Sequence, residues 1–554
     1  MKRYIWVILA VVTWIGLAVF SYRWASAIMD SIYAYRSPFA NQPVPAGGAM
    51  GKPVSRHVVS IIVDGLRVDT AANEQAMPYL SQLRAQGASA TIHSGTPSYS
   101  APAWSVLAIG AWPDLSDGPA LNPEGDALVT LWTQDNIFSA AHNAGLHTAI
   151  SGSYYYELLV PSSSLDDVFY TKDETNAGDQ LTSDAAVKFI QSGKDDYLQV
   201  HLSQVDYAGH HEGGPLDPRW NAAAARADGY IRQIVSALDL SRDTVLVFSD
   251  HGHINLGGHG GQDAIVLVQP FVMAGAHVKP GEYSDINQVD VAPTLAALLG
   301  ANIPAVAQGR ALTEMLALTE AQLEAIHQAS LAQQKILYQA YAAAMGVSPA
   351  EVTVPAGKDP VPVYQAALQQ IKNERLNRER LPRGIFAALL GLLPIYLIIR
   401  YRNRSLVWIF AAIAAYLVIF NLRYAVLQGR TYSLSSVISS NELISSTAIS
   451  ALIAFFVAWL IALSGLRLVT RPPLQAANFH IALTFITLYV VGLPVLWNLA
   501  YNGFVASWTL PEMSSMFLGF LSILQILIIA FAGLVLLGIT PLAAFLYQRI
   551  RYRD

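Results

Sequence analysis

The chain has 554 residues, of which 53% are hydrophobic and only 13% carry a charge. This composition is too apolar for a purely soluble protein, so we expect part of the chain to lie in a lipid bilayer. The formal net charge of -5 is small and comes from no long single-sign run, which argues against nucleic acid as a partner. The absence of cysteine excludes disulfides, thiolate zinc sites and a cysteine nucleophile, so any metal must be held by oxygen and imidazole.

The first predicted element is an apolar run from Ile5 to Phe20 that follows a basic start. Because no clear small-residue cleavage site comes after it, we expect residues 1–25 to be a transmembrane signal anchor rather than a cleaved signal peptide. Residues 26–56 are rich in Pro and Gly and lack periodicity, which predicts a linker. Over residues 57–316, short apolar runs alternate with helical patterns, which predicts one globular α/β catalytic domain.

A helical connector is predicted over residues 317–383, opened by a capping box of Thr319 and Gln322 and interrupted by the Pro-rich stretch VPAGKDPVPV. Residues 384–554 predict a membrane domain of about five transmembrane helices, since each apolar run is near the length that crosses roughly 30 Å of hydrocarbon. With the anchor this makes about six spans. The apolar runs are 384–399, 406–422, 443–466, 479–497 and 516–547.

The basic residues of the short loops predict how the chain is oriented. If successive spans cross the membrane in alternating directions, most of these basic residues fall on one side, and only Arg423 and Arg430 fall on the other. We therefore expect a multi-pass membrane protein with both termini cytoplasmic and the globular domain extracytoplasmic. The segment KNERLNRER places further basic residues on the outer side, which we interpret as a solvated helix face. The residues assigned to the cytoplasmic side are Lys2, Arg3, Arg400, Arg402, Arg404, Arg467, Arg471, Arg549, Arg551 and Arg553.

Three β-rich runs of the globular domain end at an aspartate, namely Asp64, Asp206 and Asp250. Buried parallel strands are continuous β-branched runs, and ligands of open α/β sheets gather at the carboxyl ends of such strands. Taken singly, each aspartate also fits a helix N-cap or a turn. Taken together, they predict that three carboxylates converge on one edge of a sheet.

Histidines stand beside two of these aspartates. His210 follows Asp206 by four residues, the spacing that brings two side chains to one face of a helical turn. His251 follows Asp250 directly, and His259 comes after INLGG. Carboxylate oxygen and neutral imidazole suit zinc or manganese, so the set predicts a divalent metal site. The alternative is a group of solvated loop histidines and capping aspartates.

The stretch GTPSYSAPAWSVLAIG places Ser100 where a polar loop turns into an apolar helix. Its hydroxyl would lie near free N–H groups at a helix N-terminus, where an anion is stabilised, and this makes Ser100 a candidate nucleophile. The alternative is that Ser98 or Ser100 only caps the helix.

The sequence leaves further residues open. His211 and His253 are either donors behind the metal ligands or simply exposed histidines. The tyrosines Tyr154 to Tyr156 either line a substrate pocket or pack within the fold.

The motifs IIVDGLR, SYSAPAWSVLAIG, VDYAGHHEG, SDHGHINLGGHGG and VDVAPTLAALLG, in this order, resemble the motif series of the alkaline phosphatase superfamily, nearest to its type I phosphodiesterase/nucleotide pyrophosphatase branch. The resemblance covers about residues 55–315. It implies an alkaline-phosphatase-like α/β domain with a central, mostly parallel sheet flanked by helices. It also implies two divalent metal ions, commonly zinc, with manganese as the alternative. One metal would be held by Asp206, His210 and His259, and the other by Asp64, Asp250, His251 and the Ser100 oxygen.

By this resemblance we expect a membrane-anchored, metal-dependent phosphodiesterase or phosphohydrolase that acts through a phosphoserine intermediate on Ser100. The expected substrate is a phosphate-ester small molecule or a lipid headgroup. The order of anchor, exported domain and C-terminal spans is similar to that of the GPI ethanolamine phosphate transferases, so the alternative is transfer of a lipid-linked phosphoethanolamine-type group. A sulfatase-like hydrolase is disfavoured because Trp104 stands where the C/S-x-P-x-R motif needs Arg, and an inactive scaffold because all six Asp and His ligands are present.

Overall fold

The computed structural model describes residues 5–123, 125–126, 129–400, 404–437 and 439–551. The chain forms two compact units. The membrane unit comprises residues 1–31, 377–506 and 511–554, and the globular unit comprises residues 32–376 and 507–510. Among the basic residues used for the predicted orientation, Lys2, Arg3, Arg402 and Arg553 lie outside the described residues.

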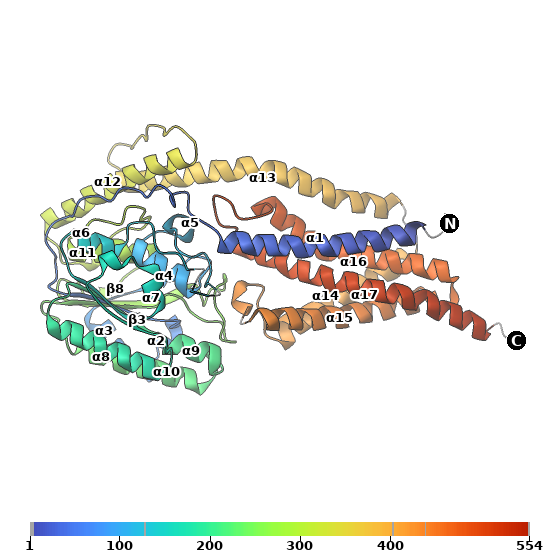
Figure 1. Cartoon of the computed structure of the whole chain (residues 1–554), viewed down its shortest axis with the longest axis horizontal. Coiled ribbons are helices and arrows are strands. Elements are labelled where there is room, and N and C mark those ends of the chain that lie inside the picture. Colours follow the sequence, from blue (N-terminus) through green and yellow to red (C-terminus); the bar gives the residue numbers. More distant parts are fainter. Residues whose placement is uncertain (1–4, 124, 127–128, 401–403, 438, 552–554) are drawn as a thin grey trace. The chain divides into compact units, whose positions relative to one another are not determined.

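The globular unit is built on a sheet flanked by helices (Figure 1). The sheet has nine strands in the order β4-β3-β5-β1-β6-β7-β2-β8, and β9 pairs with β2. The strands from β4 to β6 are all parallel, while β7 is antiparallel to both of its neighbours. The predicted central, mostly parallel sheet is therefore confirmed. The strands are β1 Val58–Val63, β2 Ala88–His93, β3 Thr148–Ser153, β4 Asp167–Thr171, β5 Tyr197–Leu202, β6 Thr244–Phe248, β7 Val268–Gly275, β8 Gly281–Glu282 and β9 Ile286–Asn287.

Helices cover both faces of this sheet, so its central strands are buried on both sides. Along β1, Val58 and Ile62 point into one hydrophobic core, while Val59, Ile61 and Val63 point into the other. The first core contains α4 Ser100–Ile109, α6 Ile137–Asn143 and α11 Val291–Leu299, and the second contains α3 Pro78–Gln86, α8 Asn176–Ser192 and α10 Pro218–Val235. Shorter helices are α2 Val68–Ala71, α5 Pro113–Ser116, α7 Tyr155–Leu159 and α9 Gln204–His211.

The connector consists of α12 Glu320–Ala344 and the first part of α13 Pro360–Arg400. The capping box predicted at the start of α12 is present, since Thr319 and Gln322 bond to each other's backbone N–H groups. The helix α13 begins at Pro360 in the Pro-rich stretch and continues without a break into an apolar segment. A single helix therefore belongs both to the connector and to the membrane unit.

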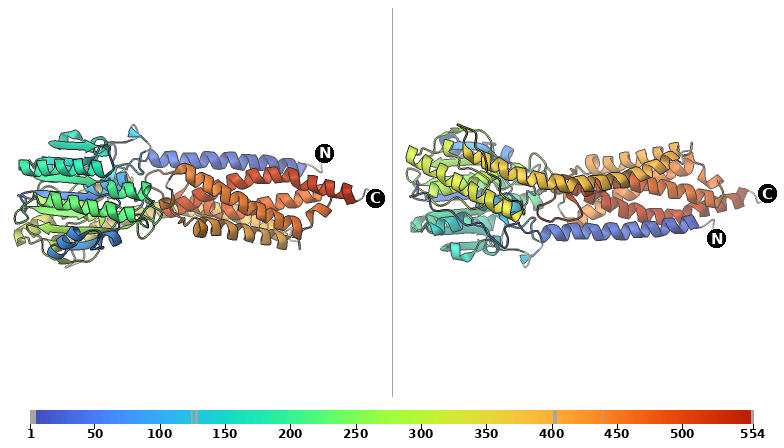
Figure 2. Two further views of the ribbon diagram at one scale, coloured as in Figure 1. Left: turned by 90° about the horizontal axis from the view of Figure 1, so that it is seen from below. Right: turned by 90° about the horizontal axis from the view of Figure 1, so that it is seen from above.

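Six helices of the described residues are long and apolar enough to cross a membrane, which agrees with the expected number of about six. Besides α13 they are α1 Ile5–Tyr33, α14 Leu406–Asn421 with its continuation to Leu427, α15 Ser440–Gly465, α16 Pro473–Asn502 and α17 Met513–Arg551. Within the membrane unit α14 to α17 run side by side as a bundle (Figure 2). The helices α16 and α17 approach closely where Gly519 and Gly533 of α17 face Asn498 and Thr484 of α16, as small residues allow in membrane bundles.

Candidate active site and metal centre

Asp64 follows the central strand β1 and lies buried at the carboxyl edge of the sheet. Its Oδ2 atom is 2.8 Å from Nε2 of His201, a buried residue of the neighbouring strand β5. The Oδ1 atom of Asp64 is buried and has no hydrogen-bond partner among the described residues. It lies 3.3 Å from Nε2 of His251. A buried carboxylate oxygen without a donor is costly unless a cation or a ligand satisfies it.

Asp250 and His251 follow the adjacent strand β6 after Ser249. The backbone N–H groups of Gly65 and His251 donate to Oδ1 of Asp250, each at 3.0 Å. The indole N–H of Trp104 donates to Oδ2 at 2.9 Å. These bonds fix the carboxylate of Asp250 beside Asp64, because β1 and β6 are parallel neighbours.

Asp206 and His210 come from helix α9, which places both on one face one turn apart. The strand β5 ends at Leu202, so the prediction that Asp206 ends a strand is wrong. The helix begins early because the carboxylate of Asp179 on α8 accepts hydrogen bonds from the backbone N–H groups of Ser203 and Gln204, at 2.7 and 3.2 Å.

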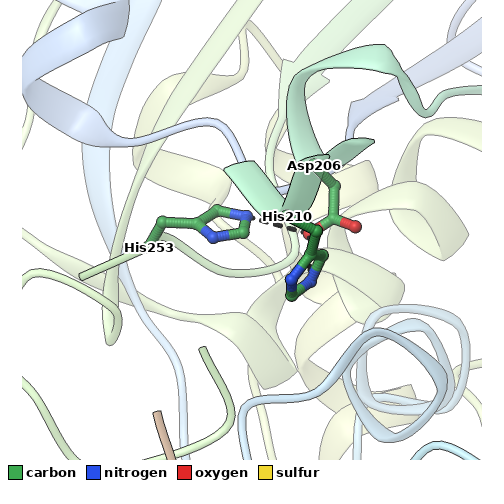
Figure 3. A group of neighbouring side chains, drawn as sticks. All are labelled: Asp206, His210 and His253. Atoms are coloured by element: carbon green, nitrogen blue, oxygen red, sulfur yellow. Dashed lines mark hydrogen bonds and ion pairs between the residues drawn. The ribbon is translucent and has the colours of Figure 1, made fainter. Parts of the chain in front are cut away.

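His253 joins this pair, although the sequence left its role open (Figure 3). The ring is fully buried, and its Nδ1–H donates to the carbonyl oxygen of Gly257 at 2.7 Å. Its Nε2 lies 2.8 Å from Oδ1 of Asp206. Since Nδ1 already provides the donor, a proton or a cation must lie between Nε2 and the carboxylate.

The glycine-rich turn after β6 returns His259 to the same place. Nε2 of His259 is 3.0 Å from Nε2 of His210 and 3.5 Å from Oδ1 of Asp206. Its Nδ1–H donates to the Ser98 carbonyl at 3.2 Å, so Nε2 presents a lone pair. The turn depends on Gly257, which has a φ of 89° and lies so close to the backbone of α9 that a Cβ would meet the Gly209 oxygen at 1.9 Å.

Ser100 is the first residue of α4, and its Oγ lies 3.1 Å from Nε2 of His251. Nδ1–H of His251 donates to the Gly252 carbonyl, which leaves Nε2 to accept from the Ser100 hydroxyl or to hold a cation. Next to Ser100, the Ala101 N–H donates to Oδ1 of Asn122 at 2.9 Å. The amide NH₂ of Asn122 thereby remains a donor for a ligand at this helix N-terminus.

Several of these side chains line a cavity of about 210 Å³. Besides five of the seven predicted residues, its lining includes Asn122, Tyr155, Glu174 and His201, whereas Asp250 and His251 do not line it. Tyr155 is thus the tyrosine of the YYY run that reaches the pocket, while Tyr156 is buried and stacks on Trp104. The full lining is Asp64, Ser100, Ala101, Trp104, Asn122, Pro123, Ser153, Tyr155, Glu174, His201, Ser203, Asp206, His210 and His259.

All seven sequence-predicted site residues lie in this one region. Six of them, together with His253, form three overlapping groups of possible metal ligands. The groups are Asp64, Asp250 and His251; Asp206, His251 and His259; and Asp206, His210 and His253. The sequence interpretation missed His201 and Asn122 and left His253 open. His211, by contrast, is exposed and contacts the ring of Tyr207.

The charges of the site favour a cation. Burial alone would lower the pKa of His251, but the carboxylates of Asp250 and Asp64 raise it to about 10. Burial and the charge of Asp64 raise the pKa of Asp250 to about 7. Burial and the neighbouring His251 hold the pKa of His259 well below its usual value, so its imidazole is neutral. The clustered carboxylates, the neutral imidazole of His259 and the unsatisfied Oδ1 of Asp64 form a donor set that fits divalent metal ions.

The chain is similar to known proteins over part of its length. Residues 58–326 match the family model of type I phosphodiesterase/nucleotide pyrophosphatase. This match includes most of the globular unit, and the similarity predicted from the motifs is confirmed. A crystal structure of wild-type alkaline phosphatase PafA aligns with a TM-score of 0.38 at 13% identity, over 48% of this chain and 99% of that structure.

The curated relatives include GPI ethanolamine phosphate transferases. The chain is 28% identical over 287 residues to GPI ethanolamine phosphate transferase 2 of Yarrowia lipolytica, which covers 47% of this chain and 33% of the relative. It is 26% identical over 338 residues to the catalytic subunit of GPI ethanolamine phosphate transferase 2 of Homo sapiens, which covers 54% of this chain and 34% of the relative. The chain thus spans about a third of the length of these relatives.

Proposed function

We propose that this protein transfers a phosphoethanolamine-type group from a membrane lipid to an alcohol acceptor, through a covalent phospho-Ser100 intermediate at a two-metal site. The observation that carries the proposal is the position of the Ser100 hydroxyl, 3.1 Å from Nε2 of His251 and in one cavity with Asp64 and Asp206. The names of the curated relatives support transfer over hydrolysis. We therefore prefer the transferase, which the sequence analysis gave as the alternative, to the hydrolase, which it placed first.

Two groups of side chains would hold the metals. Asp64, Asp250, His251 and the Ser100 oxygen form the first, supported by the unsatisfied Oδ1 of Asp64. Asp206, His210 and His259 form the second, and we add His253 to it because its Nε2 faces the Asp206 carboxylate. When bound, two metal ions would lower the pKa of the serine hydroxyl and stabilise the attacking and leaving oxygens.

The residues of the chain hold the reacting atoms in line. In the first step Ser100 gives up its hydroxyl proton and its oxygen bonds to phosphorus, while the bond from phosphorus to the lipid oxygen breaks and the lipid oxygen takes up a proton to leave as an alcohol. In the second step the acceptor hydroxyl loses its proton, bonds to phosphorus and displaces Ser100. The NH₂ group of Asn122 and the N-terminus of α4 donate to a non-bridging phosphate oxygen during both steps.

The acceptor distinguishes transfer from the second candidate, phosphodiester hydrolysis, in which water takes the place of the alcohol. The experiment is to supply purified, zinc-loaded protein with a labelled phosphatidylethanolamine, with and without a glycan alcohol acceptor. Transfer predicts a labelled acceptor that depends on Ser100. Release of free phosphoethanolamine at the same rate with and without the acceptor would support the hydrolase instead.

The basic loops support an orientation in which the globular unit is extracytoplasmic and both termini are cytoplasmic. The chain has no cysteine, so single cysteines can be labelled without a background. Leu216→Cys, on an exposed position of the globular unit, should react with an impermeant maleimide in intact cells. Thr470→Cys, in the loop between α15 and α16, should react only after permeabilisation. The reverse pattern would contradict this orientation.

A further inference from the structure

The membrane unit contains a cavity of about 750 Å³ between α1, α13, α16 and α17. Its walls are almost entirely hydrocarbon. The polar atoms of two aromatic residues in these walls are already hydrogen-bonded to backbone carbonyl groups. The Trp24 indole N–H donates to the Phe504 carbonyl at 2.7 Å, and the Tyr489 hydroxyl donates to the Gly391 carbonyl at 2.8 Å. The volume lies within the usual range of ligand pockets, roughly 300–1,000 Å³.

The side chains of the surrounding helices do not fill this cavity. Gly492 of α16 lines the cavity, and a Cβ there would meet only Cδ1 of Ile526 on α17, at 3.7 Å. A void of this size lined by hydrocarbon would forfeit many dispersion contacts, which closely packed proteins avoid. Within membrane-spanning helices, the molecule that restores these contacts is a lipid chain.

Two arginines of α13, Arg380 and Arg383, lie near one end of the cavity without lining it. Arg383 donates to the carboxylate of Glu379 at 2.8 Å, so the three side chains together carry one net positive charge. Arg383 lies one turn before Phe386, a cavity residue, and its guanidinium packs so closely on Gly503 that a Cβ there would be 2.9 Å from Cζ. Gly503 directly precedes Phe504, which also lines the cavity. Arg380 lies one turn earlier, with its guanidinium 3.5 Å from the centre of the Tyr501 ring. Guanidinium groups are well suited to phosphate, and aromatic residues mark the headgroup level of membranes.

We propose that this cavity is the binding site for one membrane glycerophospholipid, with an acyl chain between the four helices and its phosphate beside Arg383 and Arg380. The charge complementarity selects a phospholipid over a neutral lipid, and the apolar walls hold the chain. Only the use of this lipid as a donor rests on the proposed transferase function. The binding itself rests on the cavity and its basic end.

The test counts phospholipid molecules retained per chain after purification in mild detergent. Gly492→Leu would fill the cavity, and leucine is preferred to glycine inside a helix, so the fold should persist. The matched control is Gly384→Leu on α13, where a Cβ meets nothing within 4 Å and which is not part of the cavity wall. We expect Gly492→Leu to retain about tenfold less phospholipid, because two or more methylenes are excluded. The control should equal the wild type.

The same count is made on Ser100→Ala protein, which cannot form the proposed intermediate. Retained phospholipid there supports the site even if no transfer activity is ever found. Arg383→Gln should lower phospholipid retention without lowering retention of diacylglycerol, since only the phosphate contact is lost. Equal phospholipid in Gly492→Leu and wild type, or an isoprenoid lipid in place of the phospholipid, would overturn the proposal.

Discussion

His201 and Asp64 form a buried pair in which Nε2 of the imidazole lies 2.8 Å from Oδ2 of the carboxylate. This contact occupies one carboxylate oxygen and leaves Oδ1 directed toward His251, 3.3 Å away. Burial lowers the pKa of His201, but the hydrogen bond to Asp64 and the charge of that carboxylate raise it overall. His201 is therefore a positioning residue for a proposed metal ligand.

Replacing this histidine tests its positioning role. His201→Phe should weaken zinc binding about 10–100-fold, as is typical when a partner of a ligating side chain is lost. Competition with a chromogenic chelator measures this affinity directly, and the exposed His211→Phe is the control. Unchanged zinc affinity in His201→Phe would show that Asp64 needs no partner to be oriented.

The histidines around Asp206 can be tested separately. If cations lie between Asp206 and both His253 and His259, each histidine variant should lower zinc affinity, and His259→Ala should reduce the bound zinc to one ion per chain. Elemental analysis of purified protein gives the stoichiometry, with His211→Ala as the reference. Wild-type zinc affinity in His253→Ala would contradict the inclusion of His253 among the ligands.

Asn122 is expected to act on the transition state. Asn122→Ala should lower kcat by about 10²-fold or more, because a donor aimed at the charged phosphate oxygens is removed. Zinc content should stay at the wild-type value, which separates this effect from damage to the metal centre. Activity within twofold of the wild type would place the phosphate oxygen elsewhere.

Asp179 predicts a pH dependence of stability. Burial raises its pKa to about 7, against the backbone hydrogen bonds from Ser203 and Gln204 that favour the charged form. Between the ordinary value of 3.8 and about 7 the folded chain holds a proton that the unfolded chain has lost, so stability falls as pH rises. Asp179→Asn should therefore gain stability relative to the wild type from pH 4 to 7 in thermal unfolding. A Tm difference between Asp179→Asn and the wild type that stays constant from pH 4 to 7 would contradict this prediction.

The positions of Asp64 and Asp250, the two proposed metal ligands that follow β1 and β6, could be predicted because continuous buried runs identify strands, and parallel neighbours bring their carboxyl ends together. Asp206 was misplaced onto a strand end because the start of α9 is fixed by Asp179, whose carboxylate comes from another helix. No local sequence pattern indicates the contact between Asp179 and the start of α9.

The missed residues depend on tertiary structure in the same way. Asn122 reaches the Ala101 N–H across 21 residues of chain, and the helices α4 and α5 lie between them. His201 gave a weak signal, since a titratable side chain inside a fully buried strand needs a partner. Its partner Asp64, however, is 137 residues away, and only the strand pairing identifies it.

The most direct test of the proposed mechanism is to trap the covalent intermediate. Zinc-loaded protein is mixed with phosphatidylethanolamine, quenched in acid without an acceptor, digested and analysed by mass spectrometry. We predict a phosphoethanolamine adduct on the peptide that contains Ser100, absent from Ser100→Ala and removed when an alcohol acceptor is added before the quench. Turnover without any adduct on Ser100, or turnover that survives in Ser100→Ala, would contradict the account.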